Sequence, residues 1–264
     1  MKKSLRLTET AIMLALGFIL SMLKIVDMPF GGSVTAFSMV PIILIAYRYG
    51  TKWGLLAGFA ASLLQMLMGL KNLTYATGAA AVIAIIFLDY VIAFAVMGLG
   101  GIFKGKIKDQ GLAVGAAALV VCVLRYICHV ISGCTVWAGV SIPTSDGLLY
   151  SFVYNATYMI PETLVTVVGA YYAAKVFTLS TEQVKRIPLD NKASRNMVSS
   201  IPAVLSVVIS FVLICAMFQT EDGGFDVTAI TRTSFWSWLP VVITLAVGIA
   251  ATVIIKNVAF KNKA

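Results

Sequence analysis

Residues 79–103 read AAAVIAIIFLDYVIAFAVMGLGGIF, and they decide what kind of fold this chain can adopt. As a helix, this stretch is long enough to cross a bilayer of about 30 Å, so it predicts a transmembrane helix. Asp89 is its only charged residue. A charge at membrane depth is costly and usually faces a protein interior or a path for substrate. Asp89 is therefore a candidate functional residue as well.

The rest of the chain has the same character. Hydrophobic residues make up 60% of the sequence and charged residues only 12%, whereas soluble domains average about 25% charged residues. We expect an all-α polytopic membrane protein with eight helices, the second so short that neighbours must shield its ends. The apolar stretches lie at residues 11–25, 36–47, 53–70, 79–103, 112–137, 148–174, 197–218 and 235–255.

The basic residues predict the topology. If the amino terminus is cytoplasmic, sixteen Lys and Arg residues fall in inside segments, and only Lys24, Lys71 and Arg232 fall outside. This distribution satisfies the positive-inside rule and predicts a multi-pass protein of the cell membrane with both termini in the cytoplasm. The formal net charge of +9 is thus a topology signal. We expect the lipid bilayer as surroundings and no nucleic acid as partner.

Polarity divides the chain into three parts. Residues 1–177 hold six expected helices and every charge inside the membrane. Residues 178–196 are expected to form a cytoplasmic linker, and residues 197–264 two further helices without an ionisable group inside them. Any binding site should therefore lie in the first part.

Motif searches argue against enzyme activity. The single histidine excludes a two-histidine zinc motif, and no Gly-x-Ser-x-Gly elbow or complete P-loop occurs. We expect no cofactor and no bound metal. Active transport by this chain would need the energy of a partner or of an ion gradient.

Four strongly ionisable residues lie well inside the apolar stretches, namely Asp89, Arg125, His129 and Glu162. Arg125 and His129 are four residues apart and share one helix face. Trp137 lies near the outer end of the same helix. Together these residues suggest a pocket for an aromatic, cationic small molecule.

Two interpretations of these charges remain open. Arg125 needs a counter-charge in a membrane, so pairing with a carboxylate, Asp89 or Glu162, explains it without a ligand. Alternatively, Asp89 is the counter-ion of a cationic ligand. The balance favours a carboxylate partner for Arg125 and a ligand for Asp89, and both can hold in succession if the ligand replaces the arginine.

The stretch 148–174 carries a polar and aromatic helix face. Asn155, Tyr158 and Glu162 fall within about 60° of a common direction on an ideal helix. Tyr150 lies on this face only if the helix begins irregularly, so the pocket is expected to widen towards its outer end. Tyr154 is expected to belong to an interfacial aromatic belt.

Five short motifs follow one another through the first six expected helices. They are MPFGGSV (28–34), PIILIAYRYG (41–50), LDYVIAF (88–94), LRYICHVISG (124–133) and YSFVYNATYMIP (150–161). Together they resemble the thiamine-specific substrate-binding (S) component of energy-coupling-factor (ECF) transporters. The resemblance implies a six-helix bundle that binds thiamine near the extracellular side, here with two additional C-terminal helices. It also implies assembly with a transmembrane coupling protein and two ATP-binding-cassette ATPases.

The resemblance implies ligand-binding residues as well. A tryptophan that some members carry in the first outer loop is missing near Gly32, so that stacking contact is either absent or supplied by Phe30 or Phe37. The loops 29–33 and 71–77, the second with Tyr75, could close over the site. The residues that match the family's ligand contacts are Asp89, Tyr90, His129, Trp137, Tyr150 and Asn155. Glu162 has no such counterpart and is assigned a structural role.

The first expected helix offers a surface for close helix contact. Ala11 and Ala15 form a small-xxx-small pattern, and the resemblance implies that such alanines face the coupling protein. A self-standing, ion-coupled transporter of a cationic vitamin or amine remains the alternative. It would use Asp89, Arg125 and Glu162 as a proton relay.

Overall fold

The computed structural model describes residues 3–28, 31–76, 78–137, 145–180, 182–188, 191–218, 226 and 233–259. Within these residues the chain is helical apart from a small two-stranded sheet and short connections. Five of the described helices are long and apolar enough to cross a membrane. The prediction of an all-α polytopic membrane protein is confirmed. The chain divides into two compact units, Met1–Ile187 and Pro188–Ala264.

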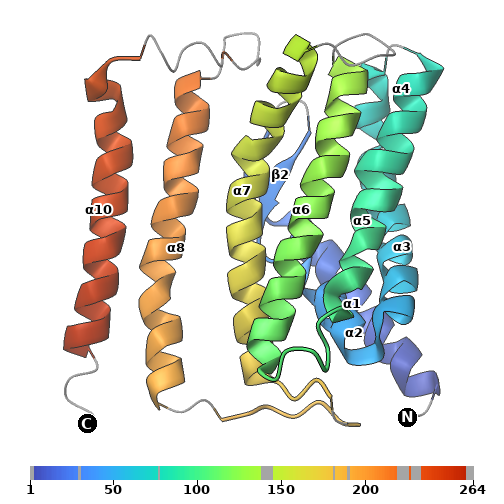
Figure 1. The fold of residues 1–264 in the computed structure, drawn as a ribbon, viewed down its shortest axis with the longest axis vertical. Helices are drawn as coiled ribbons and strands as arrows, with labels where there is room; N and C mark the ends of the chain where they lie inside the picture. The colour runs from blue at the N-terminus through green and yellow to red at the C-terminus, as the bar shows by residue number, and fades with distance from the viewer. Residues whose placement is uncertain are drawn as a thin grey trace. The chain divides into compact units, whose positions relative to one another are not determined.

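The first unit contains the four ionisable residues that lie well inside apolar stretches, namely Asp89, Arg125, His129 and Glu162. Helices α6 and α7 run side by side through it, with β2 next to α7 (Figure 1). Its long helices are α1 (Lys3–Met22), α3 (Thr51–Met68), α6 (Gln110–Trp137) and α7 (Ser145–Val176). Helix α2 (Val40–Tyr49) is short, as expected. A 3₁₀-helix, η1 (Leu70–Tyr75), follows α3.

The stretch 79–103 is expected to be one helix, and the structure divides it into four consecutive helical segments. They are α4 (Ala79–Ala84), the π-helix η2 (Ile85–Ile92), α5 (Ala93–Ala95) and the 3₁₀-helix η3 (Val96–Gly101). Asp89 therefore lies on a π-helical segment. Such wider turns occur often at functional sites because they change the direction of side chains and backbone groups.

The first connection of the chain contains a β-hairpin that the apolar pattern does not predict. Strand β1 (Lys24–Asp27) pairs antiparallel with β2 (Ser33–Thr35). The second helix then begins at Val40, four residues later than the expected start of its apolar stretch. Phe37 has a positive φ of 65°, which stops a helix from starting there.

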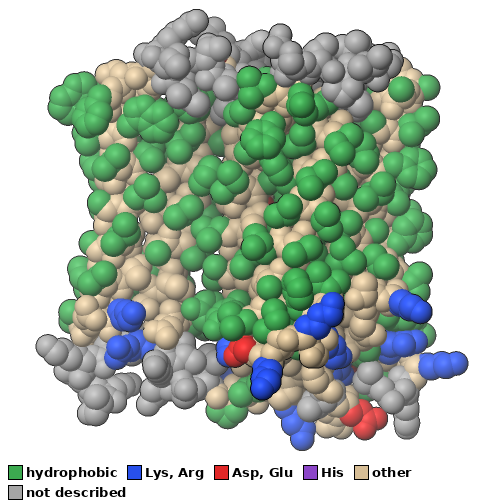
Figure 2. Space-filling view, viewed as in Figure 1, with side chains coloured by type: hydrophobic (Ala, Val, Ile, Leu, Met, Phe, Trp, Pro, Cys, Tyr) green, Lys and Arg blue, Asp and Glu red, His purple; other side chains and the backbone are tan. Residues whose placement is uncertain are grey.

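An ion pair between buried Arg48 and partly exposed Glu9 joins the start of the first unit to its interior. Arg48 Nε contacts Glu9 Oε2 at 2.6 Å, and Nη2 contacts Oε1 at 3.1 Å. Arg48 Nη1 also donates to the carbonyl oxygen of Leu179. The pair thus holds α1, α2 and the chain after α7 together. Figure 2 shows that visible Lys and Arg side chains of this unit gather near one end of its helices, while hydrophobic side chains cover the rest of the visible face.

The second unit is a pair of packed helices, α8 (Asn191–Phe218) and α10 (Leu239–Ile254). A short 3₁₀-helix, η4 (Phe235–Trp238), precedes α10, and a π-helical turn, η5 (Ile255–Ala259), follows it. Gly248 of α10 lies so close to α8 that a Cβ would come within 2.1 Å of Ser206 Oγ. Small residues therefore set the distance between these two helices.

Candidate ligand-binding cavity

A cavity of about 520 Å³ opens among the hairpin, α3, η2, α6 and α7. Pockets that bury small molecules have volumes of roughly 300–1,000 Å³. Four of the sequence-predicted site residues line this cavity, and they come from three different segments of the chain. They are Asp89, Tyr90, His129 and Asn155.

Asp89 is held by two residues of α6. Its Oδ1 lies 2.8 Å from His129 Nδ1, and its Oδ2 accepts a hydrogen bond of 2.6 Å from Ser132 Oγ. The side chain of Asp89 is 29% exposed, whereas that of His129 is 11% exposed. The carboxylate is therefore positioned by α6 and still reachable from the cavity.

Tyr90 fixes a second wall of the cavity. Its hydroxyl donates to the carbonyl oxygen of Gly69 at 3.0 Å and accepts from Asn72 Nδ2 at 3.0 Å. Asn72 Oδ1 is buried and has no hydrogen-bond partner among the described residues. Asn72 also lines the cavity, but its Oδ1 atom is buried and not exposed to the cavity.

Asn155 and Tyr158 form a connected polar pair on α7. The Tyr158 hydroxyl donates to Asn155 Oδ1 at 2.5 Å, and Asn155 Nδ2 donates to the carbonyl oxygen of Ser151 at 2.8 Å. The ring of Tyr158 meets that of His129 edge to face at 6.2 Å between centroids. This network links α7 to His129, which positions Asp89.

The expected pairing of Arg125 with a carboxylate is not formed among the residues that the structure describes. Glu162 binds Thr35 instead. Its Oε2 accepts a hydrogen bond of 2.6 Å from the backbone N–H of Thr35, and its Oε1 accepts one of 2.7 Å from the Thr35 hydroxyl. Asp89 is held by α6 as described above. Among the described residues no carboxylate oxygen lies within ion-pair distance of Arg125. Arg125 and Glu162 nevertheless line the same cavity.

The interfacial-belt interpretation of Tyr154 is also wrong. Its side chain is only 5% exposed, and its hydroxyl donates to the carbonyl oxygen of Gly31 at 3.0 Å. Residues 31–35, which we call the cap segment, lie against this face of α7. Tyr154 therefore lines the cavity together with the cap segment.

Three further sequence-predicted residues are not placed in the cavity lining. Tyr150 stacks on Tyr154 at 6.0 Å between ring centroids and does not line the cavity. Trp137 is the last residue of α6 and Tyr75 the last residue of η1, but their side chains lie outside the described residues.

Of the two candidate replacements for the missing tryptophan, Phe30 and Phe37, the structure describes only Phe37. Phe30 lies outside the described residues. Phe37 is described and packs on α7, where a Cβ at Gly169 would come within 2.4 Å of its ring. Phe37 does not line the cavity. Of the loops expected to close over the site, Gly31 to Ser33 line it, as do Lys71 and Asn72.

Sequence reasoning missed two partners of the predicted residues. Ser132 lies three positions after His129 and so shares its helix face, which is a signal that could have identified it. Asn72 lies in a connection between two expected helices, and nothing in its surroundings marks it. Both contact a predicted site residue, Asp89 and Tyr90 respectively.

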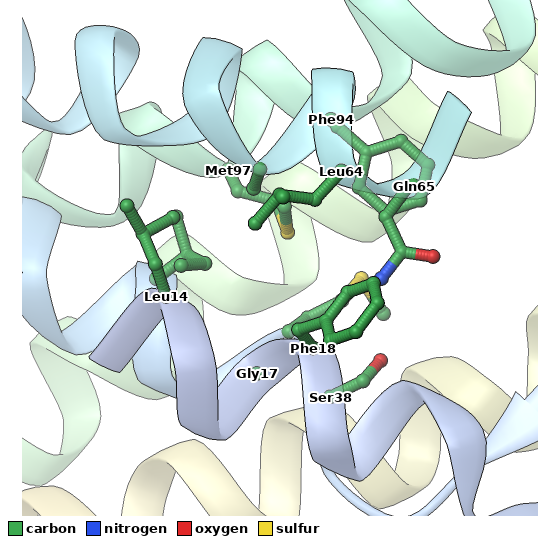
Figure 3. A pocket seen from close by; sticks show the side chains of 11 residues that line it. Leu14, Gly17, Phe18, Ser38, Leu64, Gln65, Phe94 and Met97 are labelled. Atoms are coloured by element: carbon green, nitrogen blue, oxygen red, sulfur yellow. The ribbon is translucent and has the colours of Figure 1, made fainter. Parts of the chain in front are cut away.

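A second, much smaller cavity of about 10 Å³ lies between α1 and α3. Figure 3 shows the amide of Gln65 pointing towards Phe18 at its edge, and Gln65 Nε2 donates to Ser21 Oγ at 2.7 Å. Gln65 and Ser38 also line the large cavity. Ala11 and Ala15 line neither cavity and are exposed on α1.

The donor set of the site favours an organic ligand. In the described part of the chain, no group of three or more His, Cys, Asp or Glu residues is placed to hold a metal ion. The cavity instead combines a carboxylate, hydroxyls, amide groups and aromatic rings. This combination can bind a small aromatic cation that carries hydrogen-bonding edges.

Comparisons with known proteins match the first unit. The family model described as thiamine transporter protein matches residues 7–179. Thiamine transporter ThiT of Bacillus subtilis (strain 168) is 35% identical over 175 residues, which cover 62% of this chain and 87% of that protein. A solved structure of ThiT from Listeria monocytogenes has a TM-score of 0.53 at 22% identity, covering 66% of this chain and 96% of that one. The structural match shows a shared fold, and the family match ends before α8.

Proposed function

The chain belongs to the thiamine transporter family, and on that premise we propose that it captures thiamine in the 520 Å³ cavity. We propose further that it does so as the S component of an ATP-driven ECF importer. The observation that carries the proposal is Asp89, a carboxylate that lines this cavity within an apolar stretch. The names of the relatives are those of transporters, which supports transport rather than catalysis.

The chemistry of thiamine fits the lining residues. Its thiazolium ring is a permanent cation, so a carboxylate such as Asp89 offsets a charge that no proton transfer can remove. Its aminopyrimidine carries an amino donor and ring-nitrogen acceptors. Asn72, His129 and Asn155 line the cavity, and their side chains offer polar contacts to these groups. Hydrogen bonds to such edges fix the orientation of a ligand in a mostly apolar pocket.

Aromatic side chains complete the proposed site. Tyr90 and Tyr158 line the cavity. Trp137 and Tyr75 end the segments α6 and η1, and we assign them, with Tyr150, to the outer part of the site. Stacking of a cation on such rings contributes roughly 0.5–2 kcal/mol per contact.

The proposed orientation places the cavity near the extracellular side. The positive-inside rule assigns Arg48, Lys104 and the chain termini to the cytoplasm and Lys24 and Lys71 to the outside. Lys24 and Lys71 line the cavity, which supports an opening towards the outside. Thiamine would then be captured outside and delivered inward.

The proposed partners are a transmembrane coupling protein and two ATP-binding-cassette ATPases. Ala11 and Ala15 are exposed on α1, and two small residues one turn apart allow another membrane helix to approach closely. We therefore propose this face as the coupling surface. We assign residues 1–177 to the thiamine-binding bundle, 178–196 to a cytoplasmic linker and 197–264 to an accessory extension. None of the described residues of the second unit lines the cavity.

Titration of the purified protein with thiamine, followed by tryptophan fluorescence, tests the proposed ligand. Saturable quenching by thiamine is expected, and its absence from a folded sample would exclude thiamine as the ligand.

Uptake into liposomes then separates the two transport mechanisms. Uptake should require the coupling protein and ATP, whereas uptake driven by a proton gradient in the chain alone would establish the ion-coupled alternative.

A further inference from the structure

The cap segment is attached to one face of α7 at successive turns. The Tyr154 hydroxyl donates to the carbonyl oxygen of Gly31. One turn later, the ring of Tyr158 lies so close to Gly32 that a Cβ there would come within 2.5 Å of it. Gly32 has a φ of +85°, so both the backbone conformation and the ring favour glycine at this position.

The third attachment is a buried carboxylate, one further turn along α7. Both oxygens of Glu162 accept hydrogen bonds from Thr35, one from the backbone N–H and one from the hydroxyl. Glu162 is 4% exposed and Thr35 is 6% exposed. Hydrogen bonds to a charged acceptor are roughly twice as strong as those between neutral groups. This contact is therefore the strongest of the three.

Arg125, which lines the same cavity, makes no hydrogen bond to an oxygen atom of the described residues. Its guanidinium carbon lies 4.3 Å from the centroid of the Phe94 ring, and Nη1 lies 4.0 Å from Met97 Sδ. Its Nε has no hydrogen-bond partner among the described residues. Arg125 is only 9% exposed, and a buried cation without an oxygen acceptor is destabilising. The attached cap segment thus satisfies Glu162 and leaves Arg125 in need of an acceptor.

We propose that Glu162 is a positioning residue that exchanges Thr35 for Arg125 when the cap segment leaves α7. With the cap segment attached, Glu162 holds Thr35 and the ligand supplies the acceptor for Arg125. When the cap segment detaches, Glu162 loses Thr35. Without a new partner, Glu162 would then be a buried charge with no hydrogen-bond donor, while Arg125 has no oxygen acceptor among the described residues. Pairing of Glu162 with Arg125 then satisfies both charges at once, and this lowers the free energy of the detached state. The inference rests on the proposed function, because it takes thiamine as the ligand that is retained.

Thiamine dissociation from the purified protein tests the attachment by Glu162. Glu162→Gln and Thr35→Val should each release thiamine about tenfold faster, as expected for weakening a hydrogen bond to a charged group. The double variant should be little faster than either single variant, because both changes weaken the same contact. Thr163→Val is the matched control. Thr163 does not line the cavity; the change removes a hydroxyl that donates to the carbonyl oxygen of Met159 on α7 and should keep the slow rate.

Hydrogen exchange of the ligand-free protein tests the partner exchange and needs no ligand. The Thr35 amide should exchange faster in Glu162→Gln and slower in Arg125→Gln, because the second change removes the partner that favours detachment. Unchanged dissociation in Glu162→Gln, or multiplicative effects in the double variant, would overturn the attachment. Equal or faster exchange in Arg125→Gln would overturn the partner exchange. Failure of the wild-type protein to bind thiamine would instead overturn the proposed function, and the exchange result would still decide the role of Glu162.

Discussion

Asp89 Oδ1 and His129 Nδ1 lie 2.8 Å apart, and this contact joins the π-helical segment η2 to α6. Because Ser132 binds the other oxygen, the carboxylate has a fixed direction before any ligand enters. A ligand cation therefore meets an oriented acceptor and does not have to order it. Preorganisation of this kind reduces the entropy lost on binding.

Replacing Asp89 by Asn should weaken thiamine binding by at least about tenfold. The thiazolium charge cannot be removed by deprotonation, so a neutral amide leaves it without a counter-ion. Fluorescence titration of the purified variant measures the effect. Asp109→Asn is the control, because Asp109 binds Lys175 outside the cavity lining and its loss should leave the affinity unchanged. Unchanged affinity in a folded Asp89→Asn variant would remove Asp89 from the proposed site.

Replacing Trp137 by Phe should abolish most of the fluorescence quenching by thiamine. Among the other tryptophans, Trp53 binds Thr10 and lies against Arg6, whereas Trp236 and Trp238 belong to the second unit. None of these three lines the cavity. Trp53→Phe should therefore retain the quenching. Persistent quenching in Trp137→Phe would show that another tryptophan reports on the ligand and that the outer part of the site is misassigned.

Replacing Arg48 by Met should destabilise the first unit by about 2 kcal/mol, because the change leaves Glu9 without its cation. Glu9 is 23% exposed and keeps the Tyr49 hydroxyl as a partner. The side chain of Arg48 is 3% exposed in this pair with Glu9. Lys24→Met is the comparison, since the Lys24–Asp27 pair is 40% and 55% exposed and such surface pairs contribute about 1 kcal/mol or less. Thermal unfolding in detergent should rank the two variants in this order. Equal shifts would mean that burial does not strengthen the Arg48 pair.

The sequence predicts much of the cavity because polar residues in apolar stretches need partners. Asp89, His129 and Asn155 stand out for this reason, and the structure brings them to one cavity. That Glu162 binds Thr35, and that Arg125 pairs with no carboxylate of the described residues, could not be predicted in the same way. Two carboxylates were available to Arg125 in the sequence, while the group that binds Glu162 includes a backbone N–H. Every residue except proline has such a group, so it leaves no mark in the pattern.

The hairpin β1–β2 could not be predicted from the sequence either. Its strands contain only four and three residues, too few for a reliable alternation of polar and apolar side chains. The pattern of hydrophobic residues likewise does not predict the π-helical segment at Asp89. The resemblance of the five motifs to the thiamine transporters is confirmed by the match over residues 7–179. Motifs predict the family where hydrophobic periodicity predicts no structure, because a motif depends on specific residues and not only on their polarity.

A double substitution on the exposed face of α1 tests whether thiamine binding and coupling to the ATPases depend on different surfaces. Replacing both Ala11 and Ala15 by Trp should leave the thiamine affinity of the isolated subunit unchanged, because neither residue lines a cavity. The same change should abolish ATP-dependent uptake and co-purification with the coupling protein, since bulky side chains prevent close helix approach. Ile12→Trp is the matched control. Ile12 is also exposed on α1 but is already large, so uptake should persist. Uptake by the double variant would exclude this face as the coupling surface. Loss of thiamine binding would show instead that the two alanines are needed for packing of the bundle.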